Sequence, residues 1–115
     1  MLALAVLLML RRRVRHVVVA GTSMSPTLLP GDRLLTLRTG RAPRVGGLAL
    51  SPDPRAPERM LIKRVHAIAD GRVDLRGDHT FASTDSRTFG TVPLRAVGGC
   101  IAIRYHPARR AGVVS

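Results

Sequence analysis

The sequence has few aromatic residues, a single cysteine and a single lysine, and each shortage narrows what the chain can be. Aromatic side chains make up 3% of the 115 residues and hydrophobic ones 45%. We therefore expect one small domain whose core is built from Val, Leu, Ile and Ala. The lone Cys100 excludes an internal disulfide and any metal site made of several cysteines. The sequence predicts no metal and no other cofactor.

Positive charge, by contrast, is plentiful. The chain has 19 basic and 7 acidic residues, for a formal net charge of +12. Such an excess suggests an acidic partner, which could be nucleic acid, anionic lipid or an acidic protein. Because almost no aromatic side chains stand between the arginines to stack on bases, we favour arginines spread over solvated faces. We expect no nucleic-acid partner.

The sequence also lacks a long hydrophobic run. Residues 1–10 are wholly apolar and "RRRVR" follows them. Ten helical residues rise about 15 Å, short of a hydrocarbon core of about 30 Å. In a secretory leader the positive charges come first, not last. The segment could be a shallow membrane-contacting helix, a stub of a longer anchor, or a helix packed on the domain. The arginines after it favour the cytoplasm or the cytoplasmic face of the membrane; a membrane-anchored domain outside is the alternative.

The rest of the chain predicts an all-β fold, a small twisted or barrel-like antiparallel sheet preceded by a short apolar N-terminal helix. Three prolines within 51–59 indicate a surface excursion that is neither helix nor central strand. Residues 78–90 are polar and loop-like, and one or two strands follow. We divide the chain into a hydrophobic segment 1–12, a domain 13–110 and a C-terminal tail 111–115. The clearest strands are predicted over 13–20, 32–38, 59–69 and 72–77. A hairpin turn at Asp70-Gly71 joins the last two.

The single lysine is unusual in a chain that otherwise meets its need for positive charge with arginine. Lys63 lies within "MLIKRVHAI", an apolar strand in which desolvation would lower its pKa. Arginine cannot lose its proton in a protein, whereas a buried lysine can and then serves as a general base. Taken alone, Lys63 could equally be a chance lysine that points to solvent.

A turn rich in serine, threonine, proline and glycine carries Ser23, which could serve as a nucleophile for such a base or for a Ser-His-Asp set with His66 or His79. The residues alone do not say which of these side chains meet. The turn includes "SMSPTLLPGD", and the later segments "IKRV" and "GDHTFASTDSR" follow in the same order. Together they resemble the type I signal peptidase family, serine proteases that use a Ser-Lys dyad on a largely β fold. The resemblance covers residues from about 17 to 106.

The resemblance implies roles for five residues. Ser23 would be the nucleophile and Lys63 its general base. Ser83 would hydrogen-bond and orient the lysine amine. Asp85 and Arg87 would form a structural ion pair that braces the site.

Three further positions complete or depart from the family pattern. Met24 would help to shape the turn beside the substrate. Gly21 stands where the family often has a serine that donates to the oxyanion, so the main-chain N–H of Ser23 would be one donor and backbone or water would supply the rest. His79 replaces the usual asparagine and is interpreted as a loop substitution.

Three hypotheses of function remain open, two of them proteases with different substrates. A general signal peptidase would cleave secretory preproteins at the membrane. The short Arg-rich domain and the ending "IRYHPARR" instead resemble the nickel-type superoxide dismutase maturation proteases. We favour this second reading, in which the partner is a precursor with an N-terminal leader and residues 1–12 contact the membrane. A repressor-like DNA-associated module is the third reading, although no helix-turn-helix segment is visible.

Overall fold

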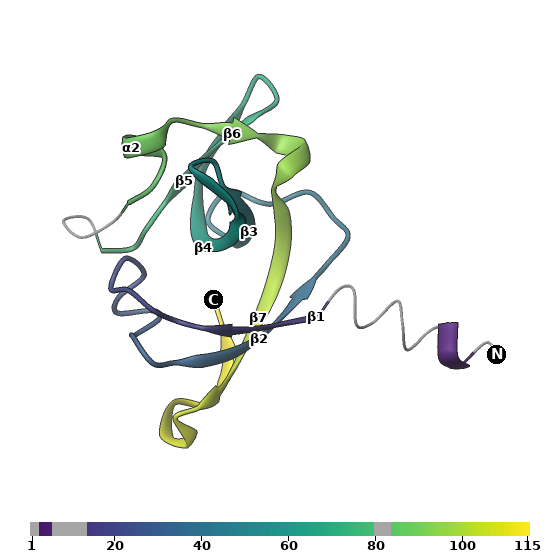
Figure 1. Cartoon of the computed structure of the whole chain (residues 1–115), viewed down its shortest axis with the longest axis vertical. Helices are drawn as coiled ribbons and strands as arrows, with labels where there is room; N and C mark the ends of the chain where they lie inside the picture. Colours follow the sequence, from purple (N-terminus) through teal and green to yellow (C-terminus); the bar gives the residue numbers. More distant parts are fainter. Residues whose placement is uncertain (1–2, 6–13, 80–83) are drawn as a thin grey trace.

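The computed structural model describes residues 3–5, 14–79 and 84–115. These residues form an eight-stranded sheet in the order β1-β2-β7-β3-β4-β5-β6, with β8 added to β7 (Figure 1). Every strand pair in it is antiparallel. The all-β, antiparallel prediction is confirmed, and the sheet is open, with β1 and β6 at its ends. The elements are β1 (Val14–Val18), β2 (Arg33–Arg38), β3 (Leu48–Asp53), β4 (Ala56–Ala69), β5 (Arg72–Arg76), α2 (Ser86–Phe89), β6 (Val92–Pro93), η1 (Leu94–Ala96), β7 (Gly98–His106), η2 (Ala108–Arg110) and β8 (Gly112–Val114).

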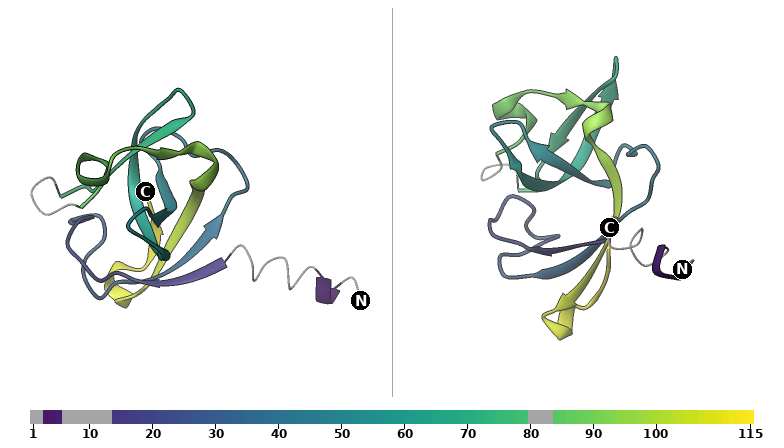
Figure 2. Two further views of the ribbon diagram at one scale, coloured as in Figure 1. Left: turned by 45° about the horizontal axis from the view of Figure 1, so that its top comes forward. Right: turned by 45° about the vertical axis from the view of Figure 1, so that its right-hand side comes forward.

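The long strand β7 joins two halves of the sheet. Its first residues pair with β3, and the remainder pairs with β2 and β8. Figure 2 shows the two halves lying one above the other, with β7 running through both. Each half has its own apolar cluster. Leu34 and Ala102 belong to one cluster, Val65 and Leu75 to the other, and all four are almost completely buried.

The hairpin between β4 and β5 forms where the sequence predicted it. Asp70 and Gly71 both have positive φ, at 53° and 71°. A two-residue turn with positive φ at both central positions matches the twist of the strands on either side. The hairpin fixes the register of β5 against β4, the strand that carries Lys63.

The prediction for residues 51–59 was wrong. They do not leave the sheet: β3 continues to Asp53, and β4 begins at Ala56. β3 pairs with β7 only at Ala49 and Leu50, so farther along one of its sides is uncovered. On that unpaired edge, a proline such as Pro52 can be accommodated, because its missing N–H then costs no hydrogen bond between strands.

Two expectations concern the ends of the chain. The apolar N-terminal helix was predicted over 1–12, of which the structure describes only residues 3–5, so it stays a prediction. Within the described ranges, no helix has the length and apolar character needed to span a membrane. At the other end, three residues of the predicted tail 111–115 form β8 and pair with β7.

Candidate active site

The turn that carries Ser23 is anchored on both sides of the serine. Backbone hydrogen bonds between Val19 and residues 31 and 32 close its base at 2.8 and 2.9 Å. Met24 is 2% exposed, and Leu28 is completely buried in the core cluster under β2 and β7. Ser23 itself is half-buried. The two apolar side chains hold the turn in the core and leave the serine hydroxyl at its surface.

Lys63 lies opposite this serine. On β4 it takes a place in the strand alternation that points inward, as Val65 does, and it is 4% exposed. Its Nζ is 2.7 Å from Oγ of Ser23. The alternative of a chance lysine that points to solvent is therefore wrong. Two residues 40 positions apart in sequence meet at hydrogen-bonding distance.

Burial also changes the pKa of this lysine. Desolvation lowers the pKa of Lys63, the charge of Asp85 opposes that shift, and the charge of Arg55 adds to it. A lowered pKa enlarges the neutral fraction of the amine near neutral pH, and a neutral amine can accept a proton. The arrangement can therefore take the proton from the serine hydroxyl.

The expected pair of Asp85 and Arg87 is present. Asp85 is fully buried, and Nη2 of Arg87 lies 2.7 Å from its carboxylate. The same carboxylate accepts the backbone N–H of Gly77 at 2.9 Å and that of Arg87 at 3.0 Å, so it caps α2. Asp85 thus links the end of β5 to the start of α2. Ser83, the proposed orienting residue, lies outside the described residues.

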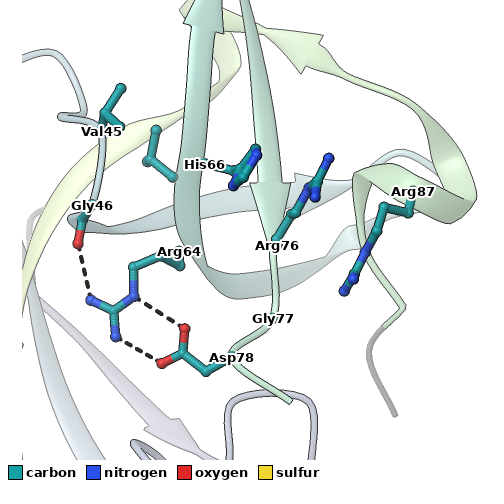
Figure 3. Close-up of a pocket in the computed structure, with 9 residues that line it drawn as sticks. Val45, Gly46, Arg64, His66, Arg76, Gly77, Asp78 and Arg87 are labelled. Carbon is teal, nitrogen blue, oxygen red and sulfur yellow. Dashed lines mark hydrogen bonds and ion pairs between the residues drawn. The ribbon is translucent and has the colours of Figure 1, made fainter. Parts of the chain in front are cut away.

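A second carboxylate, which the sequence did not single out, ties the same region to the serine turn. Asp78 accepts two bonds from Arg64, at 3.1 and 2.8 Å, and Arg64 also donates to the carbonyl of Gly46 (Figure 3). The hydroxyl of Thr27 donates to Asp78 at 2.5 Å. The segment after β5 therefore holds the serine turn from the side.

The expected loop residue His79 also contributes through its backbone. Its N–H donates to the carbonyl of Ser23 at 2.8 Å. Because this contact uses only main-chain atoms, other side chains would preserve it at this position. The contact fixes the serine's own peptide group rather than its side chain.

A third carboxylate closes the far end of the turn. Asp32 is 2% exposed and accepts from the N–H of Leu29, from Arg104 at 2.9 Å and from Arg110 at 3.1 Å. Arg104 also donates to the carbonyl of Thr27. Burial disfavours the charged form of Asp32, but the Leu29 N–H and the two guanidiniums outweigh it and hold the pKa of this carboxyl below its ordinary value.

These carboxylates, together with Asp53, which lies 3.0 Å from Nη2 of Arg55, predict acid lability. The pKa values of Asp32, Asp53 and Asp78 are all lowered in the folded protein. An aspartate whose pKa is lower in the folded than in the unfolded protein stabilises the fold when the pH is above the unfolded-state pKa of about 3.9. This stabilisation is lost as the pH falls below that value toward the folded-state pKa. Asp32→Asn should lower the free energy of unfolding by about 2 kcal/mol at pH 7 and should weaken the pH dependence of that free energy. Urea denaturation at pH 7 and pH 3 measures both effects.

The exposed turn residue Asp70 offers the matched control for that experiment. Asn tolerates positive φ as well as Asp does, so Asp70→Asn makes the same chemical change away from the buried carboxylates and should leave the stability at pH 7 close to wild type. If Asp32→Asn kept the full wild-type pH dependence, Asp32 would not be one of the groups responsible.

The two remaining predicted positions line the cleft beside Ser23 and Lys63. Gly21 is exposed, and a Cβ built on it would have no neighbour within 4 Å. Space thus exists for a serine there, and glycine simply supplies no side-chain donor. Met24 lines the cleft from below while its side chain stays in the core.

Other chemistries find less support within the described residues. No group of three or more His, Cys, Asp and Glu side chains among them could hold a metal ion. Burial raises the pKa of the Cys100 thiol to about 11, which disfavours the thiolate needed for nucleophilic attack. The contact between Ser23 and Lys63 is thus the best-formed nucleophile and base in the described structure.

Known proteins share this sequence pattern. The family model described as "Signal peptidase, peptidase S26" matches residues 1–82. The mitochondrial ATP-independent inner membrane protease subunit 1a of Arabidopsis thaliana is 35% identical, over 77% of this chain and 68% of its own. Mitochondrial inner membrane protease subunit 2 of Schizosaccharomyces pombe is 28% identical, over 85% and 70%. Subunit 1 of the Xenopus tropicalis protease is 29% identical, over 84% and 71%.

Proposed function

Since the chain belongs to the signal peptidase family, peptidase S26, we propose that it is a serine endopeptidase that removes an N-terminal leader from a precursor protein. The observation that carries the proposal is the 2.7 Å contact between Nζ of the buried Lys63 and Oγ of Ser23. A serine hydroxyl is a weak nucleophile unless a base stands beside it, and a desolvated lysine is such a base.

The proposed reaction has two steps. The neutral amine of Lys63 takes the proton of the Ser23 hydroxyl as Oγ attacks the scissile carbonyl carbon. The resulting ammonium gives that proton to the leaving amine when the peptide bond breaks, and an acyl-enzyme ester remains. Lys63, neutral again, then takes a proton from water as the water attacks the ester carbonyl. The ammonium gives this proton to Oγ of Ser23 as the ester bond breaks, which releases the leader and restores both side chains. The main-chain N–H of Ser23 is proposed to stabilise the oxyanion in both steps.

Other residues are proposed to keep this pair in place. Asp85 and Arg87 brace the segment beside the lysine, and Ser83 is proposed to orient its amine. A hydroxyl suits that role because it can accept from the amine without adding a negative charge, which would hold the proton on. Gly21 and Met24 are proposed to line the groove in which the substrate backbone lies.

We propose the precursor of a nickel-type superoxide dismutase as the substrate, cut at the cytoplasmic face of a membrane that residues 1–12 contact. The ending "IRYHPARR" and the arginines that follow the apolar segment support this choice. The second candidate is a general signal peptidase that acts on secretory preproteins. It is favoured by relatives whose names place them at the mitochondrial inner membrane. Neither candidate involves nucleic acid.

The test is intact-mass analysis of a nickel superoxide dismutase precursor from the same genome. It would be co-expressed with the wild-type chain or with its Ser23→Ala variant. We expect the precursor to be trimmed by the wild type and to stay whole with the variant. Trimming by both would contradict the role of Ser23. Trimming by neither would contradict the dismutase assignment, and the same two chains would then be tested on a secretory preprotein.

A further inference from the structure

The cleft beside the dyad has a one-sided charge. Its volume is about 580 Å³, and residues 17–24 form one wall while residues 59–63 of β4 form much of the other. Among the described residues that line it, three are basic and none is acidic: Arg55, Arg59 and Lys63. Since burial favours the neutral form of Lys63, the two arginines dominate the charge of this wall.

One of these arginines is already neutralised. Arg55 binds the buried Asp53 through two bonds, at 3.2 and 3.0 Å, and lies 5.7 Å from the centre of the Phe89 ring. Bidentate pairing of this kind fixes a guanidinium and satisfies its carboxylate. Arg55 therefore serves Asp53 and adds little net charge to the cleft.

Arg59 is different. It is exposed, and within the described ranges it has no ion-pair partner. The regular pairing of β4 with β3 ends at Met60, and Arg59, the residue before it, lines the same cleft as Lys63. Together with Arg55 and Asp53, Arg59 leaves this part of the cleft with a surplus of one positive charge.

We propose that Arg59 selects substrates with an acidic side chain about three to five residues from the bond that is cut. The inference rests on the proposed function and names a property of its substrates. An extended peptide that runs along β4 advances about 3.3 Å per residue, as the strand does. A peptide bond held at Ser23 therefore places an aspartate or glutamate about four residues away beside Arg59.

The separation also suits the chemistry. Four residues of strand span about 13 Å, more than the screening length of about 8 Å at physiological ionic strength. A carboxylate bound at Arg59 therefore leaves the pKa of Lys63 almost unchanged, whereas one bound next to the amine would raise it. The acidic residue adds to substrate binding without impairing the base.

The experiment uses a chymotryptic peptide digest of a bacterial proteome. Wild type, Arg59→Glu and Arg95→Glu are incubated with it, Ser23→Ala serves as the blank, and mass spectrometry maps the new ends. Arg95 is exposed in η1 and does not line the cleft, so its variant makes the same charge change elsewhere. Wild type and Arg95→Glu should enrich acidic residues about fivefold at one position three to five residues from the cut, and less so in high salt. Arg59→Glu should instead enrich lysine and arginine there.

The outcomes separate the two proposals. If wild type makes no cut that Ser23→Ala lacks, the protease assignment fails and this inference fails with it. If Ser23-dependent cuts appear without an acidic preference, or with one that Arg59→Glu leaves unchanged, the role of Arg59 is overturned and the protease assignment stands.

Discussion

Replacing Lys63 by arginine is expected to lower kcat/KM for precursor cleavage at least about a thousandfold, because removing one member of a catalytic unit costs that much or more. Arginine keeps the positive charge but cannot lose its proton, so the Ser23 hydroxyl would have no base. The measurement is single-turnover cleavage of a purified precursor. An active Lys63→Arg enzyme would remove the lysine from the mechanism.

Lys63→Met separates the loss of a base from the loss of the fold. Met has similar length and no charge to desolvate, so this variant should be equally inactive and no less stable than wild type in urea. The wild type supplies a further check through its pH profile. Lys63 acts when neutral, and burial lowers its pKa, so activity should rise with pH through a value below the ordinary 10.5 of lysine.

Ser23 and Lys63 were singled out by two local signals, but their pairing was predicted from the resemblance to the signal peptidase family, since neither signal alone says that the two side chains meet. Ser23 sits in a turn whose hydroxyl, proline and glycine residues are conspicuous in the sequence, and Lys63 is the single lysine in an apolar strand. The Asp70-Gly71 turn likewise needs only two adjacent residues to be recognised. Each of these signals lies within a few residues, whereas the contact between Ser23 and Lys63 spans 40 residues and was expected only from the resemblance.

The pair of Asp85 and Arg87 was expected from the resemblance, but the supports around Asp32 and Asp78 could not be predicted, because their partners are far apart in sequence. Arg104 meets Asp32 from 72 residues away, and Thr27 meets Asp78 from 51. With 19 basic residues in the chain, nothing local says which one pairs with which carboxylate. The shortage of acidic residues was the available signal. With only seven, each carboxylate has a surplus of arginines available to it, and Asp32 binds two of them.

The prediction for the proline-rich residues 51–59 was wrong for a related reason. Proline is excluded from strands that are paired on both sides, and the sequence does not reveal how far β7 extends along β3. The structure shows that this pairing stops at Leu50, before Pro52. The rule was sound, but the position of the uncovered edge depends on a strand about 50 residues later.

Asp85→Asn and Arg87→Gln are expected to shift the pH profile of cleavage in opposite directions. The charge of Asp85 raises the pKa of Lys63, and that of Arg87 lowers it. Removing the carboxylate should therefore move the rising limb of activity to lower pH. Removing the guanidinium should move it to higher pH, the more so because Asp85 then loses its counter-charge.

Both variants should also be less stable, and that shared loss makes the opposite shifts informative. Removing one partner of a charge pair is costly when the charge that stays behind is buried. Arg87→Gln leaves the completely buried carboxylate of Asp85 without this counter-charge, whereas Asp85→Asn leaves a guanidinium that is 33% exposed. Arg87→Gln should therefore lose the more stability, which urea denaturation measures. Cleavage assayed at low temperature, where both variants stay folded, gives the pH profiles. A purely structural brace would lower stability in both variants and leave the two profiles superimposed on wild type. Opposite shifts require that both charges act on the proton of Lys63.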